Sequence, residues 1–156
     1  MTSKLFQTFA PFVNILPERY RILLMYAYKH RSLPNIEAPL TFNEKIQWRK
    51  LYDRNPLFSE VADKIAVKQY VDNKNAVVKV PKILWQGKSL LQLADFTQLP
   101  ENYVIKANHA SGTNFIVTNG RHQSLKALKK LENKWSNTRI DKTYVEWGYS
   151  NIPITY

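Results

Sequence analysis

The stretch VIKANHASGTNFIV, residues 104–117, holds the side chains best suited to chemistry. Lys106 stands near the end of one β-rich run, a loop of small polar residues follows, and a second β-rich run closes the stretch. Backbone amides exposed by Gly112 and its small neighbours can donate hydrogen bonds to phosphate oxygens, and a lysine can supply compensating charge. The pattern therefore predicts a strand, a loop and a second strand that together cover a phosphate group.

Two common phosphate-binding motifs do not describe this loop. The spacing G-x-x-x-x-G-K is missing, since the lysine precedes the loop, and G-x-G-x-x-G needs more than the single glycine present. One glycine between two strands is also typical of an ordinary hairpin. Lys64, which follows Asp63 in a predicted helix, is a second candidate, although a lysine in the middle of a helix is usually solvated. The residue types alone leave both interpretations open.

Hydrophobic spacing indicates the elements that carry these residues. Helices are predicted over residues 17–31, 41–53 and 55–71, and the second begins with the capping box Thr41-Phe42-Asn43-Glu44. Further along, residues 77–85 are predicted to be extended, 89–96 a short helix, 103–106 and 115–117 two strands, and 125–135 a last helix. The predicted fold class is α/β or α+β, with a helical N-terminal region (1–55) followed by an α/β part (56–156).

The composition limits the class of protein. A chain of 156 residues with 44% hydrophobic residues can build one ordinary domain with a core. The absence of cysteine removes disulfides, thiolate metal sites and cysteine nucleophiles, and it fits a reducing compartment, so we expect a cytoplasmic location. A formal net charge of +11 indicates a polyanionic partner such as a nucleotide, a nucleic acid or an acidic membrane face.

The N-terminal segment raises the question of a membrane. Its longest uncharged run, residues 5–17, is too short and too polar to span a bilayer or to form the core of a signal peptide. Phe6, Phe9, Phe12 and Ile15 recur every three residues, so the segment could lie on the inner membrane face as a peripheral contact. A helix packed on the rest of the protein explains the same stripe and is favoured.

Residues 39–71, PLTFNEKIQWRKLYDRNPLFSEVADKIAVKQYV, resemble the signature block of the TupA-like ATP-grasp family. The later pieces VIKANHASGTNFIV and Glu146-Trp147-x-Tyr149-x-Asn151-Ile152 occur in that family in the same order and at about the same separation. The resemblance covers nearly the whole chain. It implies an ATP-grasp fold, in which ATP lies between two α+β subdomains, and an activity in which a substrate carboxylate is phosphorylated before an amine attacks it.

Matched position by position, the resemblance implies which residues contact ATP. Lys64 corresponds to a phosphate-binding lysine that precedes the flap, and Lys106 to the lysine on the strand that enters it. His109 matches a histidine common in the family, for which shaping the turn by a hydrogen bond is favoured over catalysis. Ala110 stands where members often have glycine, which removes some freedom for positive φ. The residues implied to cover the phosphates are Ser111, Gly112, Thr113 and Asn114.

The resemblance also implies parts that we expect this chain to lack. ATP-grasp catalysis uses acidic residues to hold Mg²⁺ between the phosphates, and in the last third only Glu132, Asp141 and Glu146 are acidic. We therefore expect residues 56–156 to be the N-terminal part of an ATP-grasp module, truncated before its metal-binding half and inactive as a ligase alone. The complete bacterial protein would use ATP with Mg²⁺ to build a cell-surface polysaccharide or its precursor.

Two other function classes are alternatives. Proteins of capsule and lipopolysaccharide clusters are often labelled glycosyltransferases, but no two acidic residues here have the D-x-D spacing of a metal-dependent nucleotide-sugar enzyme. A nucleic-acid-binding module would fit the charge, the four Trp and the nine Tyr. No RNP, KH or zinc-finger pattern occurs, however, and the aromatic residues fall mostly on apolar helical faces. Nucleic acid is therefore not an expected partner.

Overall fold

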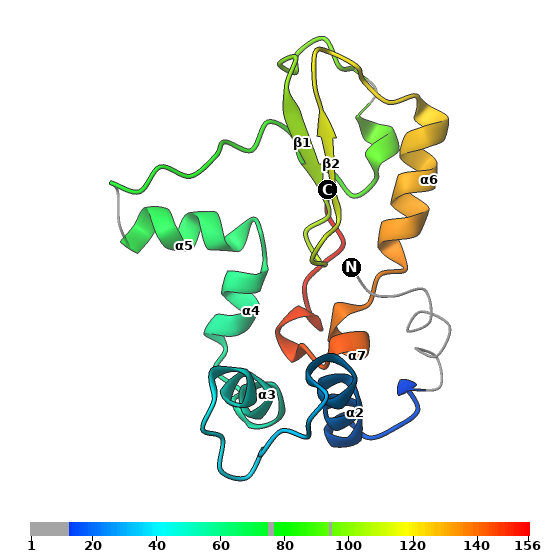
Figure 1. The fold of residues 1–156 in the computed structure, drawn as a ribbon. Helices are drawn as coiled ribbons and strands as arrows, with labels where there is room; N and C mark the ends of the chain where they lie inside the picture. Colours follow the sequence, from blue (N-terminus) through cyan, green and yellow to red (C-terminus); the bar gives the residue numbers. More distant parts are fainter. Residues whose placement is uncertain (1–12, 75–76, 94) are drawn as a thin grey trace. The chain divides into compact units, whose positions relative to one another are not determined.

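A computed structural model describes residues 13–74, 77–93 and 95–156. The described chain combines helices with one two-stranded antiparallel sheet, as expected for an α+β protein (Figure 1). The elements are, in chain order, α2 (Glu18–His30), α3 (Phe42–Tyr52), α4 (Leu57–Ala62), α5 (Ala66–Lys74), the 3₁₀ turn η1 (Leu90–Gln92), β1 (Tyr103–Lys106), β2 (Asn114–Val117), α6 (Leu125–Ser136), α7 (Ile140–Tyr144) and the 3₁₀ turn η2 (Trp147–Tyr149).

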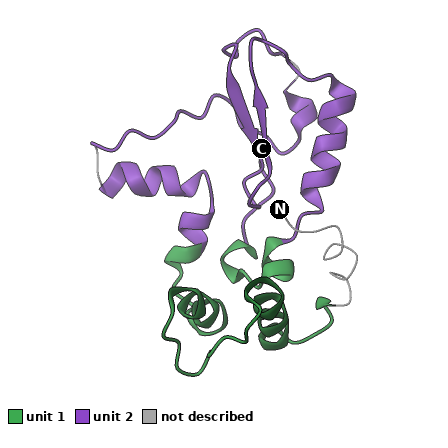
Figure 2. Ribbon diagram, in the orientation of Figure 1, with its two compact units in different colours: residues 1–58, 140–150 green, residues 59–139, 151–156 purple. Residues whose placement is uncertain are grey.

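The chain forms two compact units (Figure 2). The first contains the described residues up to Phe58 together with Ile140–Ser150. The second contains Ser59–Arg139 and Asn151–Tyr156. Each unit is therefore built from two stretches of chain that are distant in the sequence.

The first unit is helical. Its fully buried residue Ile22, on α2, clusters with Ile36 and Val145, which lie on the connection to α3 and next to α7. α2 carries an acidic residue in its first turn and basic residues in its last, a distribution that the helix dipole favours. The chain leaves α2 through Arg31, whose φ of 58° lies in the left-handed region. The helix predicted over residues 17–31 is confirmed.

The capping box predicted for the second helix is also present. Thr41 Oγ1 accepts a hydrogen bond from the Glu44 amide (3.3 Å), while the Glu44 carboxylate accepts one from the Thr41 amide (2.9 Å). Near the other end of α3, Lys50 pairs with Glu146 at 3.3 Å, which joins the helix to the returning segment 140–150. Local chemistry fixes the start of α3, and a distant segment packs near its end.

The single helix predicted over residues 55–71 is wrong, because the structure contains two. α4 ends at Ala62 and α5 begins at Ala66. The Asp63 side chain causes the break: its Oδ1 accepts hydrogen bonds from the amides of Ile65 (2.8 Å) and Ala66 (2.9 Å), which would otherwise have no partner at the start of a helix. Lys64 consequently lies in a turn between two helices.

The second unit is built around a hairpin. β1 and β2 form the predicted hairpin, and they pair antiparallel with Tyr103 opposite Val117 and Lys106 opposite Asn114. The strands and α6 contribute to one core, in which Ile105 meets Leu128. The other buried members of this core are Leu90, Leu93, Ala107, Trp135 and Tyr156.

Two predicted elements of this unit are shorter or less regular than expected. The helix predicted over residues 89–96 is a single 3₁₀ turn, η1, among the described residues. Glu132 of α6 holds this turn by accepting hydrogen bonds from the Ser89 hydroxyl (2.8 Å) and the Leu90 amide (2.6 Å). Residues 77–85 form no strand. The elements α7 and η2 were not predicted, since their sequence lacks a clear period.

The apolar stripe predicted near the N-terminus, which could contact a membrane surface, lies mostly outside the described residues. Phe6, Phe9 and Phe12 lie outside the described residues, and Ile15, the last member of the stripe, is 81% exposed. Within residues 13–74, 77–93 and 95–156, no helix is both long and apolar enough to cross a bilayer.

Candidate functional site

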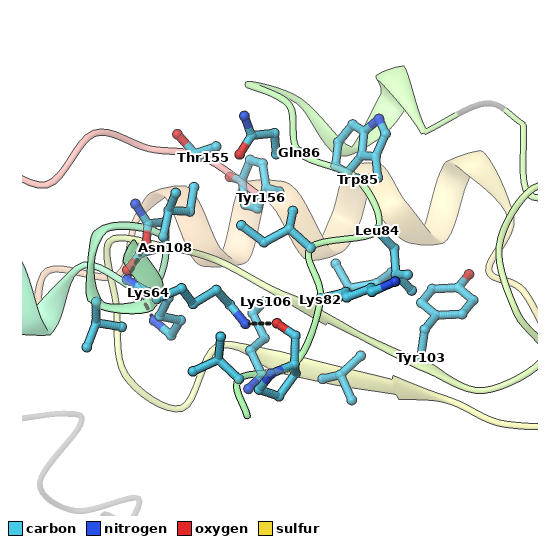
Figure 3. Close-up of a pocket in the computed structure, with 18 of the residues that line it drawn as sticks. Lys64, Lys82, Leu84, Trp85, Gln86, Tyr103, Lys106, Asn108, Thr155 and Tyr156 are labelled. Atoms are coloured by element: carbon cyan, nitrogen blue, oxygen red, sulfur yellow. Dashed lines mark hydrogen bonds between the residues drawn. The ribbon is translucent and has the colours of Figure 1, made fainter. Parts of the chain in front are cut away.

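A pocket of about 690 Å³ lies in the second unit (Figure 3). Its walls come from the turn before α5, from α5 itself, from the extended residues 80–86, from β1 and from Thr155 and Tyr156. Most of the lining is apolar. Four lysines also line it, Lys64, Lys68, Lys82 and Lys106, while no aspartate or glutamate does. Such a pocket suits an anionic ligand with an apolar part.

Lys64 is fastened to the hairpin loop. Its ammonium group donates hydrogen bonds to the carbonyl oxygens of Ala107 (2.8 Å), Asn108 (3.1 Å) and Ala110 (2.5 Å). Its backbone amide donates to Asn108 Oδ1 at 2.7 Å. A lysine ammonium has three N–H donors, so these three carbonyls satisfy the whole group. Burial lowers the pKa of Lys64, and the nearby charge of Lys106 lowers it further.

The loop itself is closed by internal hydrogen bonds. The Ala107 amide donates to the Thr113 carbonyl (3.0 Å), and the Thr113 hydroxyl bonds to the carbonyls of Ala107 (3.3 Å) and Ala110 (3.1 Å). Gly112 adopts a φ of 73°, which glycine reaches without steric cost. Thr113 is buried, whereas Ser111 and Gly112 are exposed. The loop is thus a fixed turn with an exposed tip.

His109 is buried beneath this loop. Its Nε2 lies 3.0 Å from the Trp135 carbonyl at the end of α6. Since a carbonyl can only accept, Nε2 carries the proton in this arrangement. His109 does not line the pocket. This hydrogen bond joins the loop to α6.

The residues predicted to contact ATP are thus only partly brought together. Lys64 and Lys106 line the pocket, whereas His109 and the tip residues Ser111, Gly112, Thr113 and Asn114 do not. Asn114 is nevertheless the cross-strand partner of Lys106, and both are exposed. Directly opposite residues in an antiparallel pair project from the same face, so Asn114 lies beside Lys106.

Several pocket residues were missed by sequence reasoning. Lys68 lies on α5, four residues after Lys64, and its ammonium group donates a hydrogen bond to the Pro81 carbonyl. Lys82 follows Pro81 directly, and Trp85 lies three residues further on. Tyr156 reaches the pocket because its amide and carbonyl both bond to Gly87 (2.9 and 3.0 Å). The i, i+4 spacing of Lys64 and Lys68 was the one available signal, and the others depend on tertiary contacts.

The size and lining of the pocket suit an organic anion. A cavity of about 690 Å³ is within the roughly 300–1,000 Å³ of small-molecule sites, and its apolar and cationic walls suit a base and phosphates. Among the described residues, no three His, Cys, Asp or Glu side chains gather as a metal site would require. The pocket lining itself offers no carboxylate to Mg²⁺.

A cationic, partly apolar pocket beside a lysine-bearing hairpin is the kind of site expected of an ATP-grasp protein. Comparison with family models supports this class: the model described as TupA-like ATPgrasp matches residues 44–152. The chain belongs to the TupA-like ATP-grasp family. None of the curated proteins and none of the solved structures compared with the chain matches it.

Proposed function

We propose that this chain binds the phosphates of ATP in the pocket of its second unit, as part of an ATP-grasp ligase. The observation that carries the proposal is the pocket lining, in which four lysines face no carboxylate. Lys106 is exposed and has no hydrogen bond or ion pair to a described residue. Its charge is therefore available to a phosphate oxygen, and charge-assisted hydrogen bonds to phosphate are strong.

The tip of the loop would supply uncharged donors. The backbone amides of Ser111 and Gly112 donate no hydrogen bond to a described residue, and both residues are exposed. Asn114 lies beside Lys106 across the hairpin. In this proposal Ser111, Gly112, Thr113 and Asn114 form the flap over the phosphates, and Thr113 acts by holding the loop closed. Lys64 acts in the same way, by fixing the loop from the side of α5.

The reaction proposed for the complete protein is ATP-dependent ligation of a carboxylate to an amine. A carboxylate oxygen attacks the γ-phosphorus of ATP, the bond to the β,γ-bridging oxygen breaks, and ADP leaves. The amine nitrogen then attacks the acyl carbon, phosphate leaves and the nitrogen loses a proton. Binding and charge stabilisation of the phosphates are the tasks we assign to this chain. A precursor of a bacterial cell-surface polysaccharide is the proposed acceptor.

The test is calorimetric titration of the chain with ATP. We expect Lys106→Ala to weaken ATP binding about tenfold, since it removes a charge-assisted contact. Lys126→Ala, which removes one exposed lysine of α6 outside the pocket, is the matched control and should bind ATP as the parent chain does. Equal affinities for Lys106→Ala and Lys126→Ala would remove Lys106 from the site.

A further inference from the structure

The four lysines of the pocket fall into two kinds. Lys64 and Lys68 are already occupied by the protein, because Lys64 donates to three loop carbonyls and Lys68 to the carbonyl of Pro81. These contacts fasten the loop and the extended segment to the region of α5. Their ammonium groups therefore hold the walls of the pocket together.

Lys82 and Lys106 are the other kind. Both line the pocket, both are exposed, and neither has a hydrogen bond or ion pair to another residue in the described part of the chain. They come from different elements, Lys82 from the extended segment and Lys106 from β1 (Figure 3). Two unpaired cations line a pocket whose lining contains no carboxylate, so the pocket suits a ligand with negative charge.

Lys82 is also held at a defined place. The residue before it, Pro81, accepts the hydrogen bond from Lys68 of α5. Five residues after it, Gly87 forms two backbone hydrogen bonds with Tyr156, of 2.9 and 3.0 Å. A segment without secondary structure is thus fixed at both ends, and binding through Lys82 requires little further ordering of the backbone.

We propose that Lys82 is a second phosphate-binding residue, which shares a polyphosphate ligand with Lys106. Two cations from different parts of one pocket suit a ligand with at least two linked phosphate groups, such as a nucleoside diphosphate or triphosphate. A nucleoside monophosphate can reach only one of them fully. This inference rests on the proposed function and adds to it the ligand class and a residue that the sequence did not indicate.

The experiment compares ATP, ADP and AMP by titration calorimetry, with the parent chain, Lys106→Ala and three further variants. Lys82→Ala should weaken ATP and ADP binding about tenfold and leave AMP binding within about twofold, while Lys82→Arg should retain the ATP affinity. The matched control is Lys79→Ala, which removes an exposed lysine just before this segment that does not line the pocket. Circular dichroism melting of each variant checks that the fold is kept.

The outcomes separate this inference from the proposed function. If Lys106→Ala weakens ATP binding but Lys82→Ala binds ATP as Lys79→Ala does, Lys82 is not a phosphate ligand and only this inference is overturned. The same conclusion follows if Lys82→Ala weakens AMP and ATP equally. If the parent chain binds no ATP, the proposed function fails, and the role of Lys82 fails with it.

Discussion

Lys64 shows how one side chain can serve a site by fastening it. Its three N–H groups are shared among the carbonyls of Ala107, Asn108 and Ala110, which otherwise belong to a loop without regular structure. Lys64→Met keeps most of the apolar stem and removes every one of these hydrogen bonds. We expect the free energy of unfolding to fall by about 2–4 kcal/mol, because partly buried carbonyls lose charged donors.

Urea unfolding of Lys64→Met measures this loss, with the exposed Lys126→Met as the matched control. Hydrogen exchange should also become faster at the Ala107 amide, whose hydrogen bond to the Thr113 carbonyl closes the loop. A variant as stable as the control, with unchanged exchange at this amide, would show that the three carbonyl contacts do not hold the loop.

At the residue scale, sequence reasoning singled out Lys64 and Lys106, which line the pocket, but not Lys82, which lines it too. The first two stand inside motifs, one after an aspartate in a helical block and one on a strand before a glycine-containing loop. Lys82 stands in a segment with no period, next to a proline, and only the contacts of Pro81 and Gly87 bring it to the pocket. The partners of Lys64 were equally hidden, since they lie more than 40 residues away.

At the element scale, local signals were sufficient for α2, α3, α6 and the hairpin. Each of these elements has a local signal, which is a capping box, a helical period or a pair of β-rich runs around a glycine. Such a signal predicts the secondary structure of its own short stretch without tertiary contacts. The prediction failed at Asp63, where a side chain caps a new helix within an apparently continuous apolar pattern. It also failed for η1, whose stability depends on Glu132 of a distant helix.

The cap of α3 predicts a pH dependence. Hydrogen bonds from the amides of Asn35 and Thr41, and from the Thr41 hydroxyl, lower the pKa of Glu44 from 4.5 to about 2. Because the folded pKa lies below the unfolded one, this stabilisation is present above about pH 4.5 and is lost as the pH falls toward about 2. Glu44→Gln should therefore be less stable than the parent chain at pH 7, and the difference should shrink below pH 4.5.

Thermal melts at a series of pH values between 2 and 7 test this dependence. The control Glu101→Gln removes an exposed carboxylate that bonds to no described residue. The melting temperature of this variant should therefore stay close to that of the parent chain at every pH. A Glu44→Gln difference that is constant from pH 7 to pH 2 would mean that the carboxylate charge does not stabilise the cap.

At the scale of the whole molecule, each of the two units consists of two separate stretches of the chain. The family match over residues 44–152 includes parts of both units. The sequence indicated a helical lead-in and an α/β part, but not that residues 140–150 return to the first unit. That return depends on contacts such as the pairing of Lys50 with Glu146. Separations of this size leave no periodic trace in a single sequence.

The net charge of +11 leads to the last prediction, because it suits nucleic acid as well as ATP. Nucleic acid and ATP would bind through different groups of this chain. Nonspecific binding to a single strand relies on many spread cations and on stacking aromatics, and Tyr20, Phe42 and Tyr52 are exposed here. Random oligonucleotides should therefore bind at low salt and release at about 150 mM salt, since counterion release weakens with added salt.

Fluorescence anisotropy of a labelled random oligonucleotide measures this release, and an ATP titration at the same two salt concentrations is the comparison. In the proposed site ATP contacts the apolar pocket walls as well as Lys106, so salt weakens only part of its binding. We expect ATP affinity to fall by less than about tenfold over that range. Oligonucleotide binding that survives at physiological salt while ATP binding disappears would favour a nucleic-acid-binding protein and contradict the pocket assignment.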